Sequence, residues 1–240
     1  MARAATSPLQ RPSPQATRKA APMTCFDYRA LALAPLERDP FEFVLVKDFL
    51  SSEVLARIDE DFPDVPGPGS HPPSELAIRG HLKTLVEELN SDAFRRLVET
   101  KFAVDLRDLP TMYTVRGYLR ERDGKAHTDS ETKVITVLLY LNRRWTAPGG
   151  RLRLLRGDDV ENFAVEIPPD GGTLLIFKRS DKSWHGHKPY AGKRRALQFN
   201  WVTCADVVRH EQRRHAYSTR VKKFGAYLFG AHHVRNLSAE

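Results

Sequence analysis

The first half of the chain shows a helical hydrophobic pattern. Apolar residues recur every three or four positions between residues 51 and 102, which predicts a bundle of short helices. One helix is expected after Ser51, whose hydroxyl suits an N-cap, a second from Ser74, and a third from the Asn-Ser-Asp run at 90–92. The proline- and glycine-rich stretch 63–73 predicts a loop between the first two.

From Pro110 onward the pattern changes to short apolar segments separated by turn residues. Such segments predict strands, and the expected ranges are 111–119, 134–141, 151–155, 163–167, 173–177 and 195–202. One further strand is expected at 41–46, before the helices. Many short strands preceded by helices favour a mainly β fold, a sandwich or jelly roll with N-terminal helices packed on one face.

Charge is distributed unevenly along the 240 residues. The chain carries a formal net charge of +8, of which residues 1–22 contribute four bases and no acid, and residues 205–240 contribute seven bases and three acids. The central segment 23–204 is therefore neutral, which argues against nucleic acid as a partner of the core. We expect a disordered segment at 1–22, a domain at 23–204 with helical support at 23–109 and a β core at 110–204, and a basic helix and tail at 205–240. A transit segment and an over-extended start before Met23 are alternatives for 1–22.

Two cysteines, Cys25 and Cys204, lie far apart and form no Cys-x-x-Cys pair. This spacing argues against a disulfide framework or a zinc knuckle, and it favours a reducing, cytoplasmic location. No apolar run approaches the roughly 18 residues that a membrane span requires.

The candidate chemistry begins at His127-Thr-Asp129, directly before the strand expected at 134–141. In an extended segment residues i and i+2 point to the same side, so the imidazole and the carboxylate can converge. A third ligand is available in the downstream run Ser183-Trp-His185-Gly-His187. Two histidines and one carboxylate form the set typical of non-haem Fe(II) sites with open positions. Alone, a His-x-Asp pair is a weak signal, because it is more often a hydrogen-bonded pair in a loop than a metal site.

The order of motifs resembles the prolyl-4-hydroxylase-like branch of the 2-oxoglutarate/Fe(II) dioxygenases. The resemblance rests on His127-Thr-Asp129, Ile135 to Asn142, the Pro168 to Gly172 turn, His185-Gly-His-Lys-Pro189 and the arginines before Trp201, and it covers about residues 111–202. It implies a double-stranded β-helix that holds one Fe(II), with 2-oxoglutarate and O2 as co-substrates and ascorbate as a candidate reductant. The implied reaction is C–H hydroxylation of a small-molecule, glycan or peptide substrate.

The resemblance also assigns residues. It makes His127, Asp129 and His185 the metal ligands, because Pro189 and an arginine about ten positions on both count back to His185 rather than to His187. Arg195 is expected to bind the distal carboxylate of 2-oxoglutarate. In a strand, Arg195 shares a face with Leu197, Phe199 and Trp201, and we expect this apolar face to be the barrel interior. Arg194, with Gln198 and Asn200, would then face outward.

Further cofactor contacts follow from the same resemblance. Thr136, Leu138 and Tyr140 share one strand face and are expected to line the 2-oxoglutarate pocket, and Tyr118, nine residues before His127, is expected close to the cofactor. Lys133 is expected in solvent. Two other functions compete with a hydroxylase: a nucleic-acid demethylase of the same superfamily, and a jelly-roll binding module without catalysis.

Overall fold

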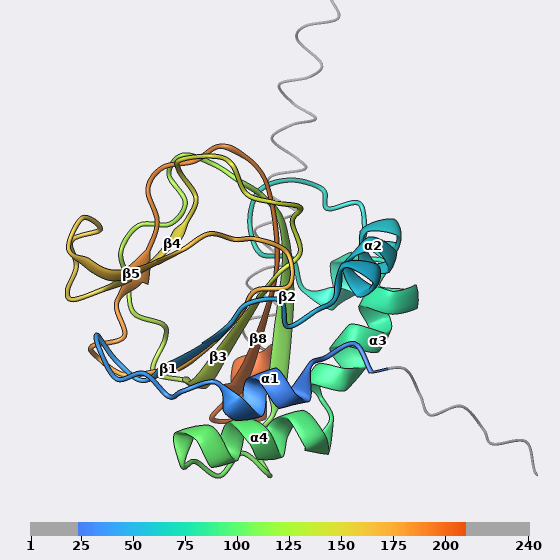
Figure 1. The fold of residues 1–240 in the computed structure, drawn as a ribbon, viewed down its shortest axis with the longest axis horizontal. Helices are drawn as coiled ribbons and strands as arrows, with labels where there is room; N and C mark the ends of the chain where they lie inside the picture. The colour runs from blue at the N-terminus through green and yellow to red at the C-terminus, as the bar shows by residue number, and fades with distance from the viewer. Residues whose placement is uncertain (1–23, 210–240) are drawn as a thin grey trace, which may run out of the picture.

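The computed structural model describes residues 24–209 (Figure 1), so the predicted segment 1–22 and most of 205–240 lie outside the described residues. Two antiparallel sheets make up the β core. The large sheet has the order β1 (Phe43–Val46), β6 (Leu174–Lys178), β3 (Lys133–Tyr140), β8 (Gly192–Val202) and β2 (Thr111–Leu119). The small sheet has the order β5 (Phe163–Ile167), β4 (Leu152–Leu155) and β7 (His185–Gly186).

The two sheets form a jelly roll, which confirms the predicted fold class. An apolar cluster between them joins Phe43, Leu175 and Phe177 of the large sheet to Leu152, Leu154 and Ile167 of the small one. Alternation along each strand puts their neighbours, such as Val44, Leu174 and Ile176, on the opposite face. The expected strands are present, with ends shifted by up to three residues; β7, only two residues long, was not predicted.

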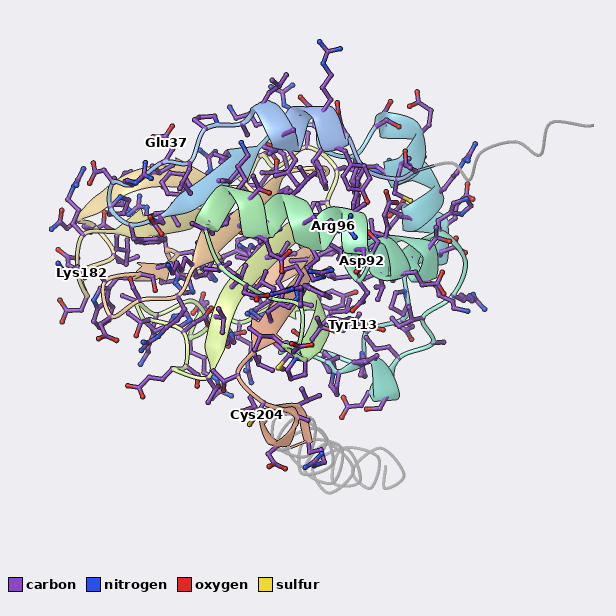
Figure 2. All side chains as sticks on the ribbon, turned by 90° about the horizontal axis from the view of Figure 1, so that it is seen from below. Glu37, Asp92, Arg96, Tyr113, Lys182 and Cys204 are labelled. Carbon is purple, nitrogen blue, oxygen red and sulfur yellow. The ribbon has the colours of Figure 1, made fainter. Side chains whose placement is uncertain are left out.

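Helices cover the outer face of the large sheet. They are α1 (Tyr28–Leu33), α2 (Ser52–Asp61), α3 (Gly80–Leu89) and α4 (Asp92–Phe102), with a 3-10 turn η1 at Pro73–Glu75. Figure 2 shows α4, which carries Asp92 and Arg96, lying across the strands, and its Phe94 stacks on Trp201 of β8 with ring centroids 6.1 Å apart. One hydrophobic cluster joins the helices to the outward residues of β3, β6 and β8. The helices are therefore a packed layer of the fold.

Two of the three predicted helix starts are confirmed by caps. The hydroxyl of Ser51 accepts a hydrogen bond from the amide of Val54, and that of Ser91 accepts one from Phe94. The helix predicted from Ser74 instead begins at Gly80, where φ is +53°. The Asp61 carboxylate accepts the amide of His81 at 2.7 Å, and a Cβ at residue 80 would collide with that carboxylate. Helix α3 therefore starts where another helix's carboxylate reaches it, a contact that local sequence does not show.

In the described residues, no helix has the length and apolar character needed to cross a membrane.

Candidate metal centre and cofactor cavity

The predicted ligand residues meet at one end of the jelly roll. His127 lies in the connection between β2 and β3, and its backbone pairs with that of His185 in β7 through N–O distances of 3.0 and 2.9 Å. One donor atom from each of His127, Asp129 and His185 lies within 4.8 Å of the other two. Residues 58 positions apart are thus held together by a short backbone ladder, which the sequence did not reveal.

Hydrogen bonds fix which nitrogen of each histidine is free. Nδ1 of His127 lies 2.8 Å from the carbonyl oxygen of Lys125, and Nδ1 of His185 lies 2.9 Å from that of Ser183. A carbonyl accepts only, so each Nδ1 carries a proton, and in the neutral form of each ring Nε2 holds the lone pair that a metal needs. Burial lowers the pKa of His185 from 6.5 to about 4, so this imidazole is neutral at pH 7. Both features are those of a metal-ligating histidine.

The Asp129 carboxylate is buried, and each of its oxygens accepts one hydrogen bond. Oδ1 accepts a hydrogen bond from the Lys133 ammonium at 2.8 Å, and Oδ2 accepts one from the Thr136 hydroxyl at 2.6 Å. Thr136 in turn accepts a hydrogen bond from the amide of Asn200 at 2.8 Å. Burial alone would raise the pKa of Asp129, but Lys133, His185 and these hydrogen bonds more than offset it and hold the pKa at about 2. The carboxylate is therefore ionised and oriented at neutral pH.

Lys133 is not in solvent as predicted. Its side chain lines the cavity beside Asp129, with 18% of its surface exposed. The register of β3 against β8 shifts between Lys133 and Ile135, and this irregularity breaks the alternation that would have turned Lys133 to the outer face.

A cavity of about 550 Å³ opens beside the three candidate ligand residues. Its floor is the inner face of three neighbouring strands, with Thr136, Leu138 and Tyr140 from β3, as predicted, and Ala196, Gln198 and Asn200 from β8. Strand β2 supplies Met112, Thr114 and Arg116 on the far side. The floor is largely polar, whereas the outer face of the same strands is apolar.

Arg195 does not face this cavity, and the predicted orientation of β8 is wrong. Arg195 forms an ion pair with Asp59 of α2, and its guanidinium carbon lies 4.2 Å from the centroid of the Phe62 ring. Leu197, Phe199 and Trp201 share this face and pack against the helices. The prediction assumed that the apolar face of β8 points into the barrel. In the structure this apolar face points outward and is buried under the helices.

Arg194 occupies the position that was predicted for Arg195. The side chain is buried and lines the cavity, where Nε donates to the carbonyl of Gly150 at 2.8 Å and Nη2 donates to the Tyr140 hydroxyl at 3.3 Å. In the described residues no carboxylate lies within ion-pairing distance of Arg194. The alternation already placed Arg194 with Gln198 and Asn200, so the signal was present and only the choice of face was wrong.

His187 and Tyr118 complete the predicted set. His187 is buried in the cavity wall but outside the three-residue cluster, and a Cβ at Gly124 would lie 2.1 Å from its Nε2. Tyr118 is 40% exposed and does not line the cavity, contrary to prediction. The register of β2 against β8 shifts between Arg116 and Tyr118, which turns Tyr118 away from the face that carries Thr114 and Arg116.

We compared the sequence and the structure with known proteins. Residues 111–203 match the model of the 2OG-Fe(II) oxygenase superfamily. A prolyl 4-hydroxylase structure from Phytophthora capsici is 18% identical, with 77% of this chain and 68% of that chain covered and a TM-score of 0.52. A Pseudomonas putida prolyl-4-hydroxylase is also 18% identical, with 73% and 90% covered and a TM-score of 0.47. No curated protein matches the sequence.

At these identities the solved structures bear on the fold alone, while the matched segment contains all three clustered ligand residues. The family's cofactors are Fe(II) and 2-oxoglutarate, with O2 as co-substrate, and the donor set found here fits them. Residues 111–203 of this chain thus match the 2OG-Fe(II) oxygenase superfamily, which indicates a dioxygenase, and they lie in a fold similar to that of a prolyl 4-hydroxylase.

Proposed function

We propose that this protein is a hydroxylase that couples the decarboxylation of 2-oxoglutarate to succinate with hydroxylation of a C–H bond in a primary substrate. The observation that carries the proposal is the convergence of His127, Asp129 and His185 at the rim of a cavity that contains a buried arginine without a carboxylate partner in the described residues.

Two neutral nitrogens and one ionised oxygen suit Fe(II) and leave coordination positions free. When bound there, Fe(II) supplies the site at which 2-oxoglutarate and O2 react next to one another. The task of the protein is to hold the three ligands ready. Thr136 and Asn200 fix the plane of the Asp129 carboxylate, and the two backbone carbonyls fix the histidine rings. Such outer hydrogen bonds orient ligands and raise their basicity.

Arg194 is the proposed anchor for the distal carboxylate of 2-oxoglutarate, in place of Arg195. A guanidinium presents two parallel N–H groups that match a carboxylate in bidentate fashion. Tyr140 lies at the same end of the floor, and its hydroxyl, already in contact with Arg194, is placed to donate to the same carboxylate. Leu138, one step along the same face, offers apolar contact to the methylene groups of the co-substrate.

We further propose residues 23–204 as one catalytic domain, with 23–109 as helical support and 110–204 as the core. The hydrophobic cluster that joins α1–α4 to the large sheet supports a single domain. The thiols of Cys25 and Cys204 are free, which supports the cytoplasm as the proposed compartment.

The deciding experiment compares Asp129→Ala with Asp158→Ala, an exposed carboxylate in the turn after β4. Each protein is loaded anaerobically with Fe(II), its bound iron is measured, and 2-oxoglutarate turnover to succinate is followed after O2 is admitted. Asp129→Ala should lose bound iron and succinate formation, because it removes a ligand and the charge that balances the metal. Retained iron and full turnover in Asp129→Ala would refute the proposed centre.

A further inference from the structure

Three cationic side chains line the active-site cavity, and their partners differ. The Lys133 ammonium is paired with Asp129 at 2.8 Å. Arg194 donates to a backbone carbonyl and to the Tyr140 hydroxyl. Arg116 donates from Nη2 to the hydroxyl of Ser70 at 2.8 Å. Within residues 24–209, neither guanidinium has a carboxylate within 4.0 Å, so two of the three cations have only neutral partners.

The remaining carboxylate of the cavity wall does not supply the missing partner. Asp123 lines the same cavity, but Oδ2 accepts the amide of Arg120 at 2.9 Å and Oδ1 accepts the Arg120 guanidinium at 3.1 Å. Its charge is therefore already matched by Arg120. Burial and the nearby Arg194 lower the pKa of Arg116, which shows that the surroundings of Arg116 disfavour its charge as they stand. A partly buried guanidinium in this situation is stabilised by a bound anion.

Arg116 and Tyr140 lie on opposite sides of the cavity floor. Ala196 of β8 pairs with Arg116 of β2 on one side and with Tyr140 of β3 on the other. Two strand spacings separate the backbones of Arg116 and Tyr140, which is roughly 10 Å. Strand β2 is the edge strand of the large sheet, so Arg116, Thr114 and Met112 form the wall farthest from β6. The β2 wall thus lies across the floor from Tyr140, although the charge of Arg194 still acts on Arg116.

Given the proposed function, each carboxylate of 2-oxoglutarate can be assigned to a positively charged partner in the cavity. 2-Oxoglutarate has two carboxylates; one belongs with the metal, and the other is taken by Arg194 and Tyr140. The co-substrate therefore leaves Arg116 without a partner. We propose that Arg116 is the anion-binding residue for the primary substrate, and that this substrate carries a carboxylate or a phosphate group.

This assignment rests on the proposed function and narrows its substrate class. The anion on Arg116 fixes one end of the substrate at the β2 wall, while the C–H bond to be hydroxylated points across the floor toward His127, Asp129 and His185. The side chains around Arg116 are suited to a polar ligand, since Ser70, Thr114 and Gln198 all line this part of the cavity. Neutral molecules of the same shape would leave the guanidinium unmatched and would bind poorly.

The experiment measures anion binding by the enzyme already loaded with Fe(II) and saturating 2-oxoglutarate, under anaerobic conditions. Inorganic phosphate and acetate are titrated separately by calorimetry, and they represent the phosphate and carboxylate classes. The proteins compared are the wild type, Arg116→Met, Arg194→Met as the co-substrate-site variant, and Arg143→Met, whose arginine is 93% exposed in a different cavity. A parallel titration gives the affinity of each protein for 2-oxoglutarate.

We expect one of the two anions to bind the wild type with saturation, and the one that binds identifies the class. Arg116→Met should weaken this binding about thirtyfold or more, because a charged partner is lost from a buried pair. Arg143→Met should leave it unchanged, and 2-oxoglutarate affinity should change by less than about twofold in Arg116→Met and Arg143→Met.

Three results would overturn the assignment: no saturable binding of either anion by the loaded wild type, equal binding by Arg116→Met, or a loss of 2-oxoglutarate affinity in Arg116→Met as large as in Arg194→Met. The last result would place Arg116 in the co-substrate site. If the wild type binds neither Fe(II) nor 2-oxoglutarate, the proposed function fails instead, and the parallel titration separates the two cases. If Arg116→Met does not fold, the same titrations of Arg116→Gln and the wild type decide whether anion binding depends on the Arg116 charge.

Discussion

Replacement of Arg194 by Met tests the orientation of β8 and the co-substrate site together. Methionine keeps much of the length of the side chain and removes the charge. In the proposed complex it leaves the distal carboxylate of 2-oxoglutarate without its guanidinium and with the Tyr140 hydroxyl alone. Removal of one partner of a buried, hydrogen-bonded charge pair costs roughly 2–5 kcal/mol. The dissociation constant for 2-oxoglutarate should therefore rise by about thirtyfold at the least.

The neighbouring arginine is the matched control. Arg195→Met removes the ion pair with Asp59 and the contact with the Phe62 ring, both on the helical side of β8. A partly exposed ion pair and a cation–π contact together contribute about 1–2 kcal/mol, so this variant should unfold more easily. Its affinity for 2-oxoglutarate should stay within about twofold of the wild type, because the Arg195 guanidinium lies on the far side of the strand.

The assay is calorimetric titration of each metal-loaded protein with 2-oxoglutarate in the absence of O2, with thermal unfolding measured on the same samples. The two variants should show opposite profiles: Arg194→Met loses affinity, and Arg195→Met loses stability. Equal losses of affinity in both variants, or a loss confined to Arg195→Met, would contradict the orientation found for β8.

The remaining predictions concern the metal ligands, their supports and the ends of the chain. His185→Ala should lose bound iron, whereas His187→Ala should keep it; iron analysis decides, and the reverse outcome would make His187 the ligand. Thr136→Val should weaken Fe(II) binding about tenfold to a hundredfold by removing the hydrogen bond to Asp129, while the exposed Thr146→Val should not. Burial lowers the pKa of His187 from 6.5 to about 4, so the unfolded chain binds more protons between these values. His187 should therefore contribute a fall of about 3 kcal/mol to the free energy of unfolding of the metal-free protein as the pH drops from 6.5 to 4, and His187→Gln should remove this contribution from a pH series of urea denaturations. Deletion of residues 1–22 should leave 2-oxoglutarate decarboxylation within about twofold, and a collapse of turnover would give this segment a part in catalysis.

The periodicity of apolar residues predicted the layers of the fold, because the face that each helix or strand buries is visible in the spacing of its own apolar residues. Ser51 and Ser91 marked helix starts through the short-range bonds of an N-cap, and the β pattern after Pro110 marked the sheets. Elements that depend on distant partners were missed. Helix α3 starts at a carboxylate from α2, and the two residues of β7 form a strand only because β4 and His127 pair with them.

The grouping of the three candidate metal ligands was predictable for a similar reason. Asp129 and His127 are two residues apart, and His185 was selected over His187 by its spacing from a proline and an arginine in the resembled family. The structure gathers these three residues and leaves His187 outside their cluster. Lys133, Thr136 and Asn200, which hold the Asp129 carboxylate, come from two strands, and the contact of Lys133 depends on a register shift that no periodic pattern contains.

Strand β8 shows the limit of the argument from hydrophobicity. Alternation divides its residues into two faces, one with Arg195, Leu197, Phe199 and Trp201 and one with Arg194, Gln198 and Asn200, but it does not say which face looks into the barrel. In a closed core the apolar face would be inside. Here the outer surface of the sheet is buried under α1–α4, so it needs the apolar side chains, and the inner surface surrounds a cavity for charged ligands, so it needs the polar ones. The same rule applies to β2, where Arg116 and Thr114 face inward with Met112, and it places both arginines that lack a carboxylate partner where an anion can reach them.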